Sequence, residues 1–100
     1  MNQIVLDCIN LIDTGQPILV SFKCFKSIYS VDKGGVVPIP KLNEKVVGGH
    51  AVSIIGYTIE CALFMFVNTW GNQWGDGGHG YLPFYYFENN LIYEIYTFKY

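Results

Sequence analysis

VVGGHAVSIIGY (residues 46–57) and ALFMFVNT (residues 62–69) are the clearest strand patterns of this chain, and a short connection separates them. Runs rich in β-branched and aromatic residues predict β-strands, and two such runs joined by few residues predict an antiparallel hairpin. His50 lies near the start of the first run, and Asn68 lies near the end of the second. We therefore expect a β-rich fold with His50 and Asn68 at the open end of this hairpin.

The connection sets which residues face each other. If Thr58-Ile59-Glu60 forms the loop, Tyr57 lies opposite Cys61 and the numbers of paired residues sum to 118, which places His50 opposite Asn68. Directly opposed residues share one face of a sheet, with Cβ atoms about 4.5–5.5 Å apart. A slip of one residue would send them to opposite faces. We predict that the Asn68 amide reaches a ring nitrogen of His50.

A histidine oriented by an asparagine is a pair typical of nucleophilic hydrolysis. The imidazole takes a proton from a nucleophile and later gives it to the leaving group, while the asparagine carbonyl oxygen holds one ring N–H in place. Trp70 would cover that hydrogen bond and exclude water. Each residue alone has an ordinary structural explanation, but their types, order and spacing together favour the catalytic hypothesis. His79, in Gly77-Gly78-His79-Gly80, has no such companions and is interpreted as a loop residue.

Composition restricts the other classes of function. The 100 residues are 51% hydrophobic and 14% charged, against about 25% charged in average chains. We expect a single domain over residues 1–100, with one core and some apolar surface that has no partner within the chain. A net charge of −2 with scattered basic residues argues against nucleic-acid binding. No apolar run approaches the roughly 20 residues of a membrane span, and residues 1–10 do not resemble a signal peptide, so the compartment stays open.

The three cysteines, Cys8, Cys24 and Cys61, are not spaced like metal ligands, and no metal or cofactor is predicted. We interpret them as free thiols that are buried or half-buried. A catalytic cysteine needs a lowered pKa, and Cys8 lies late in an apolar helical pattern. Cys24 has two lysines nearby that would stabilise a thiolate, but nothing around it resembles a nucleophile motif.

The remaining elements are predicted from periodicity and turn residues. Apolar residues recur at helical spacing before Gly15 and Pro17, which predicts a helix over residues 2–14. Strands are expected at 18–23 and 91–98, loops at 32–45 and 71–80, and an extended segment that turns at Pro83 over 81–87; residues 25–31 fit either a helical turn or an extended segment. The predicted fold is α+β, with one N-terminal helix packed on an antiparallel sheet or partly closed β-barrel.

Two motifs carry a resemblance to a known family, the papain-like cysteine peptidases. Gly48-Gly49-His50-Ala51-Val52, with Ile54, Gly56 and Tyr57, resembles the histidine strand of that family, and Asn68-Thr69-Trp70-Gly71 with Trp74-Gly75 resembles its Asn-Ser-Trp-Gly-x-x-Trp-Gly element. The likeness covers about residues 2–99 and concerns the C-terminal, β-rich half, the right-hand domain of the family. Thr69 replaces the usual serine and keeps its hydroxyl, whereas His79 and Gly80 replace residues that are commonly aromatic.

The resemblance implies a role for each matched residue. His50 would be the catalytic histidine and Asn68 its orienting asparagine, with Trp70 shielding their bond and bordering the primed-side subsite. Trp74 would support Trp70, Gly49 would offer its backbone carbonyl to substrate, and Ala51 would line the specificity pocket. The catalytic cysteine, the oxyanion-hole glutamine and the helix-rich half do not occur in the sequence. The family's cysteine signature would fall on the order of 80 residues before Met1.

Three hypotheses follow. The first is a fragment of a cysteine-type peptidase that carries the histidine and asparagine and is inactive alone, acting on peptide or protein substrates only when the nucleophile half completes it. The second is a non-catalytic binding or regulatory module that docks through the former domain interface. The third is a subunit completed in trans by a cysteine-bearing chain. In each case the apolar face around His50, Trp70 and Trp74 is expected to be exposed and to promote self-association or partner binding.

Overall fold

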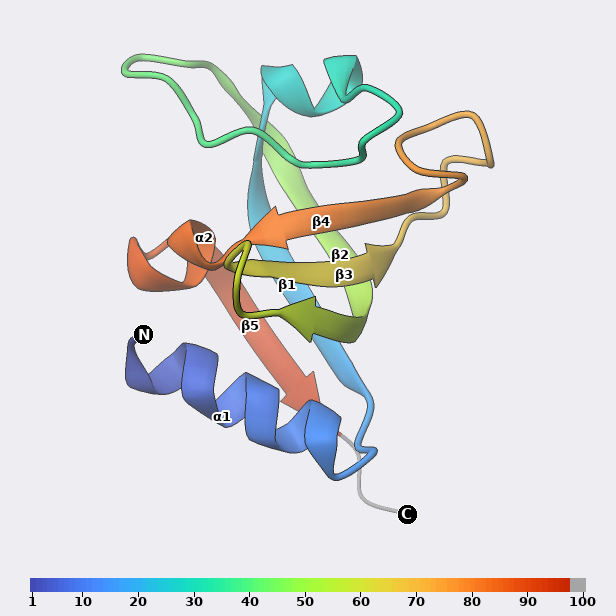
Figure 1. The fold of residues 1–100 in the computed structure, drawn as a ribbon. Helices are drawn as coiled ribbons and strands as arrows, with labels where there is room; N and C mark the ends of the chain where they lie inside the picture. Colours follow the sequence, from blue (N-terminus) through green and yellow to red (C-terminus); the bar gives the residue numbers. More distant parts are fainter. Residues whose placement is uncertain (98–100) are drawn as a thin grey trace.

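The computed structural model of the chain describes residues 1–97, which form an N-terminal helix, a five-stranded antiparallel sheet and a second short helix (Figure 1). The elements in chain order are α1 (Gln3–Asp13), β1 (Ile18–Phe25), the 3₁₀ helix η1 (Lys26–Ser30), β2 (Val46–Thr58), β3 (Leu63–Val67), β4 (His79–Pro83), α2 (Phe84–Glu88) and β5 (Ile92–Thr97). The predicted α+β class is confirmed. No helix within these residues is long and apolar enough to cross a bilayer.

The long strand β2 lies at the centre of the sheet, whose order is β4-β3-β2-β1-β5. β1 pairs with β2 from Ile54 back to Val46, but β3 pairs only with the stretch of β2 from Ser53 to Thr58. The N-terminal part of β2 is therefore unpaired on its β3 side. This opening is where the chain that leaves β3 passes His50.

The predicted register between β2 and β3 is wrong in detail. Tyr57 pairs with Phe64 rather than with Cys61, because the loop has four residues, 59–62, and ends at Ala62 with φ 56°. A bulge at Ile55 then shifts the pairing by one residue, so that Ser53 lies opposite Val67. Pairs beyond the bulge sum to 120, which has the same parity as the predicted 118. His50 and Asn68 consequently keep the same face of the sheet.

Aromatic side chains fill the core between the sheet and the helices. α1 begins at the cap Asn2, whose side chain accepts from Val5 N–H, and buries Val5, Cys8 and Ile9. The largest buried side chains are Tyr86, Phe22, Phe64 and Phe66. The amphipathic pattern that predicted residues 2–14 as a helix is thus the face that α1 turns to the core.

Some boundaries near the C-terminus differ from the predictions. β4 starts at His79, inside the predicted 71–80 loop; the extended segment ends at Pro83, where the turn was predicted, and the residues after it form the helix α2. Phe84 and Phe87 of α2 pack on Phe64, with ring centroids 4.7 and 4.8 Å away, so tertiary packing outweighs the weak helix propensity of aromatic residues there. The predicted strand 91–98 corresponds to β5, and Phe98 lies outside the described residues. Residues 25–31 were expected to form either a helical turn or an extended segment, and residues 26–30 form the 3₁₀ helix η1.

Candidate active site

His50 and Asn68 meet at the opening beside β2. His50 Nε2 lies 3.0 Å from Asn68 Oδ1, as the sequence predicted. His50 is held on β2 opposite Phe22 of β1, and Asn68 follows the last residue of β3. The backbone N–H of Asn68 donates to Gly78 O at 2.9 Å. The glycine-dense loop after β3 therefore helps to fix the asparagine against the histidine.

The hydrogen bonds around Asn68 define the tautomer of His50. Thr69 N–H donates to Asn68 Oδ1 at 2.8 Å. A backbone N–H is only a donor, so the side-chain atom it reaches must be the carbonyl oxygen and not the amide nitrogen. His50 Nε2 meets the same oxygen and must therefore carry a hydrogen. In the neutral ring, Nδ1 is then the basic nitrogen.

Asn68 is buried at a cost to stability. Its side chain is 6% exposed, and its Nδ2 has no hydrogen-bond partner among residues 1–97. A buried polar group without a partner costs about 1–3 kcal/mol. Because an apolar residue would avoid that cost, the asparagine is better explained by its bond to His50 than by stability.

Aromatic rings enclose the imidazole on two sides. The Trp70 ring lies 4.9 Å from that of His50 at an angle of 33°, and Phe22 meets His50 edge-on at 5.9 Å. Tyr29 of η1 stacks on Trp70 at 5.7 Å, and Trp74 meets Trp70 edge-on at 5.6 Å. We call Tyr29, Trp70 and Trp74 the aromatic wall. The wall and Phe22 thus border the imidazole, which is half-buried.

Two of these aromatic neighbours were not identified from the sequence. Phe22 had a usable signal, because it alternates with Val20 and Cys24 on the buried face of β1. Tyr29 had none, since it lies in a segment whose structure the pattern left open. Trp74 is held by a long-range bond, its Nε1 donating to Ile28 O at 3.1 Å, which no local pattern reveals.

Gly49 and Ala51 lie next to the His50–Asn68 pair, but a side chain at either position would face the other side of the sheet. They flank His50 on β2 and lie opposite Lys23 and Ser21 of β1. Successive residues of a strand point to opposite faces, so a side chain at either position points away from the face that carries the imidazole. A Cβ at Gly49 would lie 3.3 Å from the Tyr93 ring, a tight contact that a glycine avoids. The structure therefore brings together the side chains of His50, Asn68, Trp70 and Trp74, and Gly49 lines the same small pocket as His50 and Trp70, whereas the Ala51 side chain lies on the other face of β2.

Cys24 is the cysteine that lies near His50. Both line a small pocket of about 60 Å³, together with Gly48 and Trp70. Cys24 is only 5% exposed, and burial raises the pKa of its thiol to about 11. The thiol is thus protonated at neutral pH and lacks the character of an activated nucleophile.

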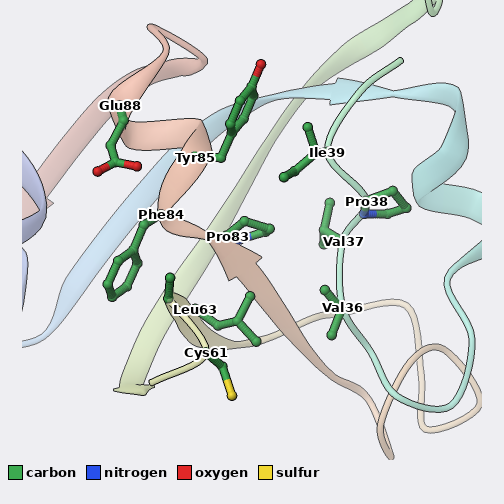
Figure 2. A pocket seen from close by; sticks show the side chains of 11 residues that line it. Val36, Val37, Pro38, Ile39, Cys61, Leu63, Pro83, Phe84, Tyr85 and Glu88 are labelled. Carbon is green, nitrogen blue, oxygen red and sulfur yellow. The ribbon is translucent and has the colours of Figure 1, made fainter. Parts of the chain in front are cut away.

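The other two cysteines are remote from the pair. Cys8 is buried in α1, where burial and then the charge of Asp7 raise the pKa of its thiol to about 11. Cys61 is exposed in the β2–β3 loop, beyond the C-terminal end of β2, whereas His50 lies in the N-terminal half of that strand. Cys61 lies at the rim of an apolar groove of about 430 Å³ formed by residues 36–39, the loop and α2 (Figure 2). That groove is separate from the His50 site.

In the described residues His50 is thus hydrogen-bonded to Asn68, and the nearby Cys24 has a thiol whose pKa is raised by burial. The described residues also contain no group of three or more His, Cys, Asp or Glu side chains that could hold a metal ion. His79 lies on β4, with its Nδ1 3.2 Å from Asp76 O, and takes no part in the His50 site.

Comparison with known proteins places this geometry in context. Residues 4–95 match the family model described as papain family cysteine protease. The chain is 39% identical over 75 residues to an uncharacterised peptidase C1-like protein of Acanthamoeba polyphaga mimivirus, covering 73% of this chain and 24% of that protein. It is 36% identical over 64 residues to cathepsin B-like cysteine proteinase 3 of Caenorhabditis elegans, covering 62% and 16% of the two chains.

A solved structure shares the fold of this chain. Xylellain, a cysteine protease from Xylella fastidiosa, superimposes with a TM-score of 0.80 and 30% identity, covering 89% of this chain and 34% of that one. The chain therefore spans about a quarter or less of the two relatives and about a third of the solved structure.

Proposed function

Because the chain belongs to the papain family of cysteine proteases, we propose that it supplies the base half of a thiol peptidase site. Residues 1–100 act as one domain, with His50 as the proton carrier and Asn68 as its orienting residue. The observation that carries the proposal is the 3.0 Å contact between His50 Nε2 and Asn68 Oδ1, with the oxygen identified by the Thr69 amide. It leaves Nδ1 of the neutral ring free to accept a proton.

The reaction needs a cysteine from a helix-rich half, carried either by the same polypeptide or by a second chain. Its thiol proton moves to His50 Nδ1, and the thiolate attacks the carbonyl carbon of a peptide bond. The C–N bond then breaks as the imidazolium gives that proton to the leaving amine. Water, deprotonated by the same nitrogen, hydrolyses the thioester and restores the thiol. Asn68 keeps the Nε2–H bonded through every step.

The neighbouring residues serve this chemistry in different ways. Trp70 shields the His50–Asn68 bond, and Trp74, tied to Ile28 O, keeps Trp70 in place. Gly49 lines the same small pocket as His50 and Trp70, and Ala51 follows His50 on β2, so both border the path of a peptide or protein substrate past the imidazole. Their small size allows a substrate backbone to approach closely.

The aromatic wall is also the surface on which the cysteine-bearing half docks. Trp70 is 42% exposed and Tyr29 is 64% exposed, a large fraction for aromatic side chains. Aromatic residues with such exposure are enriched at interfaces. The lack of an activated thiol among the described residues also favours a second function, in which the chain docks through the same wall as a non-catalytic regulatory module.

Mixing experiments separate these functions. The 100-residue chain alone should neither cleave a fluorogenic peptide nor be labelled by an epoxide inhibitor of papain-like thiols. Adding the cysteine-bearing half of a papain-family protease such as xylellain, as a separate or fused chain, should restore both. His50→Ala should abolish hydrolysis, and His79→Ala is the matched control that should keep it.

Two results would decide against the catalytic proposal. Docking of the cysteine-bearing half without hydrolysis would favour the regulatory module. Labelling of Cys8, Cys24 or Cys61 in the chain alone, lost in His50→Ala, would mean that the chain carries its own nucleophile.

A further inference from the structure

The two edges of the sheet are protected to very different degrees. At the β4 edge, Val37 N–H donates to Tyr81 O at 2.9 Å, and Tyr81 N–H donates to Gly35 O at 2.8 Å. The loop before β2 therefore covers that edge. At the other edge, β5 pairs with β1 on its inner side, and no residue from 1 to 97 pairs with its outer side.

The composition of β5 does little to prevent pairing with another strand. Natural edge strands are blunted by lysine, proline, short length or bulges. β5, with the sequence IYEIYT, has neither lysine nor proline and has Glu94 as its one charged residue. Tyr93, Ile95 and Tyr96 are 54%, 37% and 50% exposed. The one bulge lies at Tyr93 near its start, which leaves Glu94 to Thr97 in regular pairing.

The register shows which backbone groups face outward. Lys23 N–H donates to Leu91 O at 2.8 Å, so the backbone groups of Lys23, and by alternation those of Ser21 and Leu19, point toward β5. Ser21 and Leu19 pair with Glu94 and Tyr96, whose groups point back toward β1. The N–H and C=O groups of Ile95 therefore point away from the sheet.

We propose that β5 pairs antiparallel with β5 of a second copy, across a two-fold axis that passes beside Ile95. An axis perpendicular to the sheet requires a residue to face its own copy. Centred on Ile95, the pair uses the outward backbone groups and sets Tyr96 opposite the partner's Glu94.

Charge and geometry favour this register over its neighbour. Centred on Glu94, the pair would oppose two carboxylates, and the backbone groups of that residue already face β1. Within one chain the Tyr96 hydroxyl donates to a Glu94 carboxylate oxygen, so the same two groups suit a contact between copies. β1 lies between β5 and β2, so the dimer leaves the aromatic wall uncovered.

In the proposed dimer Ile95 faces Ile95 of the second copy, so charged substitutions at this position test the contact. The unmodified chain should sediment as a monomer–dimer equilibrium at micromolar concentration. Ile95→Lys and Ile95→Glu should each be monomeric, because each places like charges on the axis, and an equimolar mixture should form a mixed dimer. Ile95→Val is the matched control that should still dimerise. Trp70→Ser with Trp74→Ser should leave the dimer unchanged.

Hydrogen exchange tests the same contact without a substitution. With rising concentration, the Ile95 amide should gain at least several-fold protection, while those of Glu94 and Tyr96, which face β1, should not. A chain that stays monomeric, or a dimer that both charged variants retain, would overturn the proposal. So would protection of Ile95 that appears only when a cysteine-bearing half is added, because the edge would then belong to that partner.

Discussion

At the residue scale, the site depends on one oxygen atom that accepts two hydrogen bonds. The Thr69 N–H identifies Asn68 Oδ1, and that oxygen in turn requires a hydrogen on His50 Nε2. The Thr69 backbone amide, two hydrogen bonds away from Nε2 if the shared oxygen is counted through, thus determines which nitrogen of the imidazole is basic. Asn68 therefore acts on proton transfer by selecting the basic nitrogen of His50, and this role does not depend on how much Asn68 contributes to stability.

The two histidines should adopt opposite tautomers when both rings are neutral. His50 should carry its hydrogen on Nε2, whereas His79 should carry it on Nδ1, because that atom faces the carbonyl oxygen of Asp76 at 3.2 Å. Imidazole ¹⁵N chemical shifts distinguish the two forms. Asn68→Ala should return His50 to a mixture and leave His79 unchanged. A His50 ring that is mainly Nδ1–H in the unmodified chain would contradict the assigned geometry.

The cysteines should differ in reactivity according to burial. The pKa of Cys8 and of Cys24 is raised from 9.0 to about 11, so below pH 9 their thiolate fractions are about 100-fold lower than in the unfolded chain. Their alkylation by iodoacetamide should be slow at pH 7–9 and should rise toward pH 11, whereas exposed Cys61 should react first. Peptide mapping by mass spectrometry measures each rate. Rapid modification of Cys24 at pH 7, in folded protein, would mean that it is activated by His50.

At the scale of elements, the face of each strand could be predicted from the sequence, but the register could not. Val52 and Ile54 alternate with exposed neighbours, Phe64 and Phe66 alternate with less buried ones, and the burial of these four determines which side His50 and Asn68 share. The loop length and the bulge at Ile55 had no sequence signal, since an alanine rarely adopts the left-handed conformation of Ala62. The His50–Asn68 contact was nevertheless predicted, because the residue numbers of paired residues sum to an even number both in the predicted register and in the observed register beyond the bulge, which keeps the two residues on one face.

Gly80 is explained only by the packing of two strands. It lies opposite Phe66, and a Cβ at this position would overlap the Phe66 ring. Gly80→Ala should therefore lower the free energy of unfolding by about 1–3 kcal/mol in chemical denaturation. Adding Phe66→Leu should cost less in that background than in the unmodified chain, because the smaller side chain makes room.

Gly56→Ala is the matched control for this substitution. Gly56 also lies in a strand, but its added Cβ would meet Met65 Cβ at an ordinary 4.0 Å. Its effect should stay within about 1 kcal/mol. Equal losses at the two glycines, or no coupling between residues 66 and 80, would show that backbone conformation and not the Phe66 ring requires Gly80.

At the scale of the whole molecule, the chain has two separate surfaces that lack partners within residues 1–97. The aromatic wall borders the open end of β2, and the outer edge of β5 lies beyond β1. Sequence composition indicated that some apolar surface would be left over, but only the sheet order shows that the aromatic wall and the β5 edge are separate parts of it. A partner on one surface should therefore leave the other accessible.

Tryptophan fluorescence should report on the aromatic wall alone. Trp70 is 42% exposed, whereas Trp74 is partly buried with its Nε1 bonded to Ile28 O, so acrylamide should quench mainly Trp70. Trp70→Phe should remove most of the quenchable signal, and Trp74→Phe, the matched control, should retain it. A cysteine-bearing half that docks on the wall should protect Trp70, while dimerisation through β5 should not change quenching. If Trp70 becomes less accessible to acrylamide as the concentration of the chain alone is raised, the copies associate through the aromatic wall. The two surfaces then do not have separate partners.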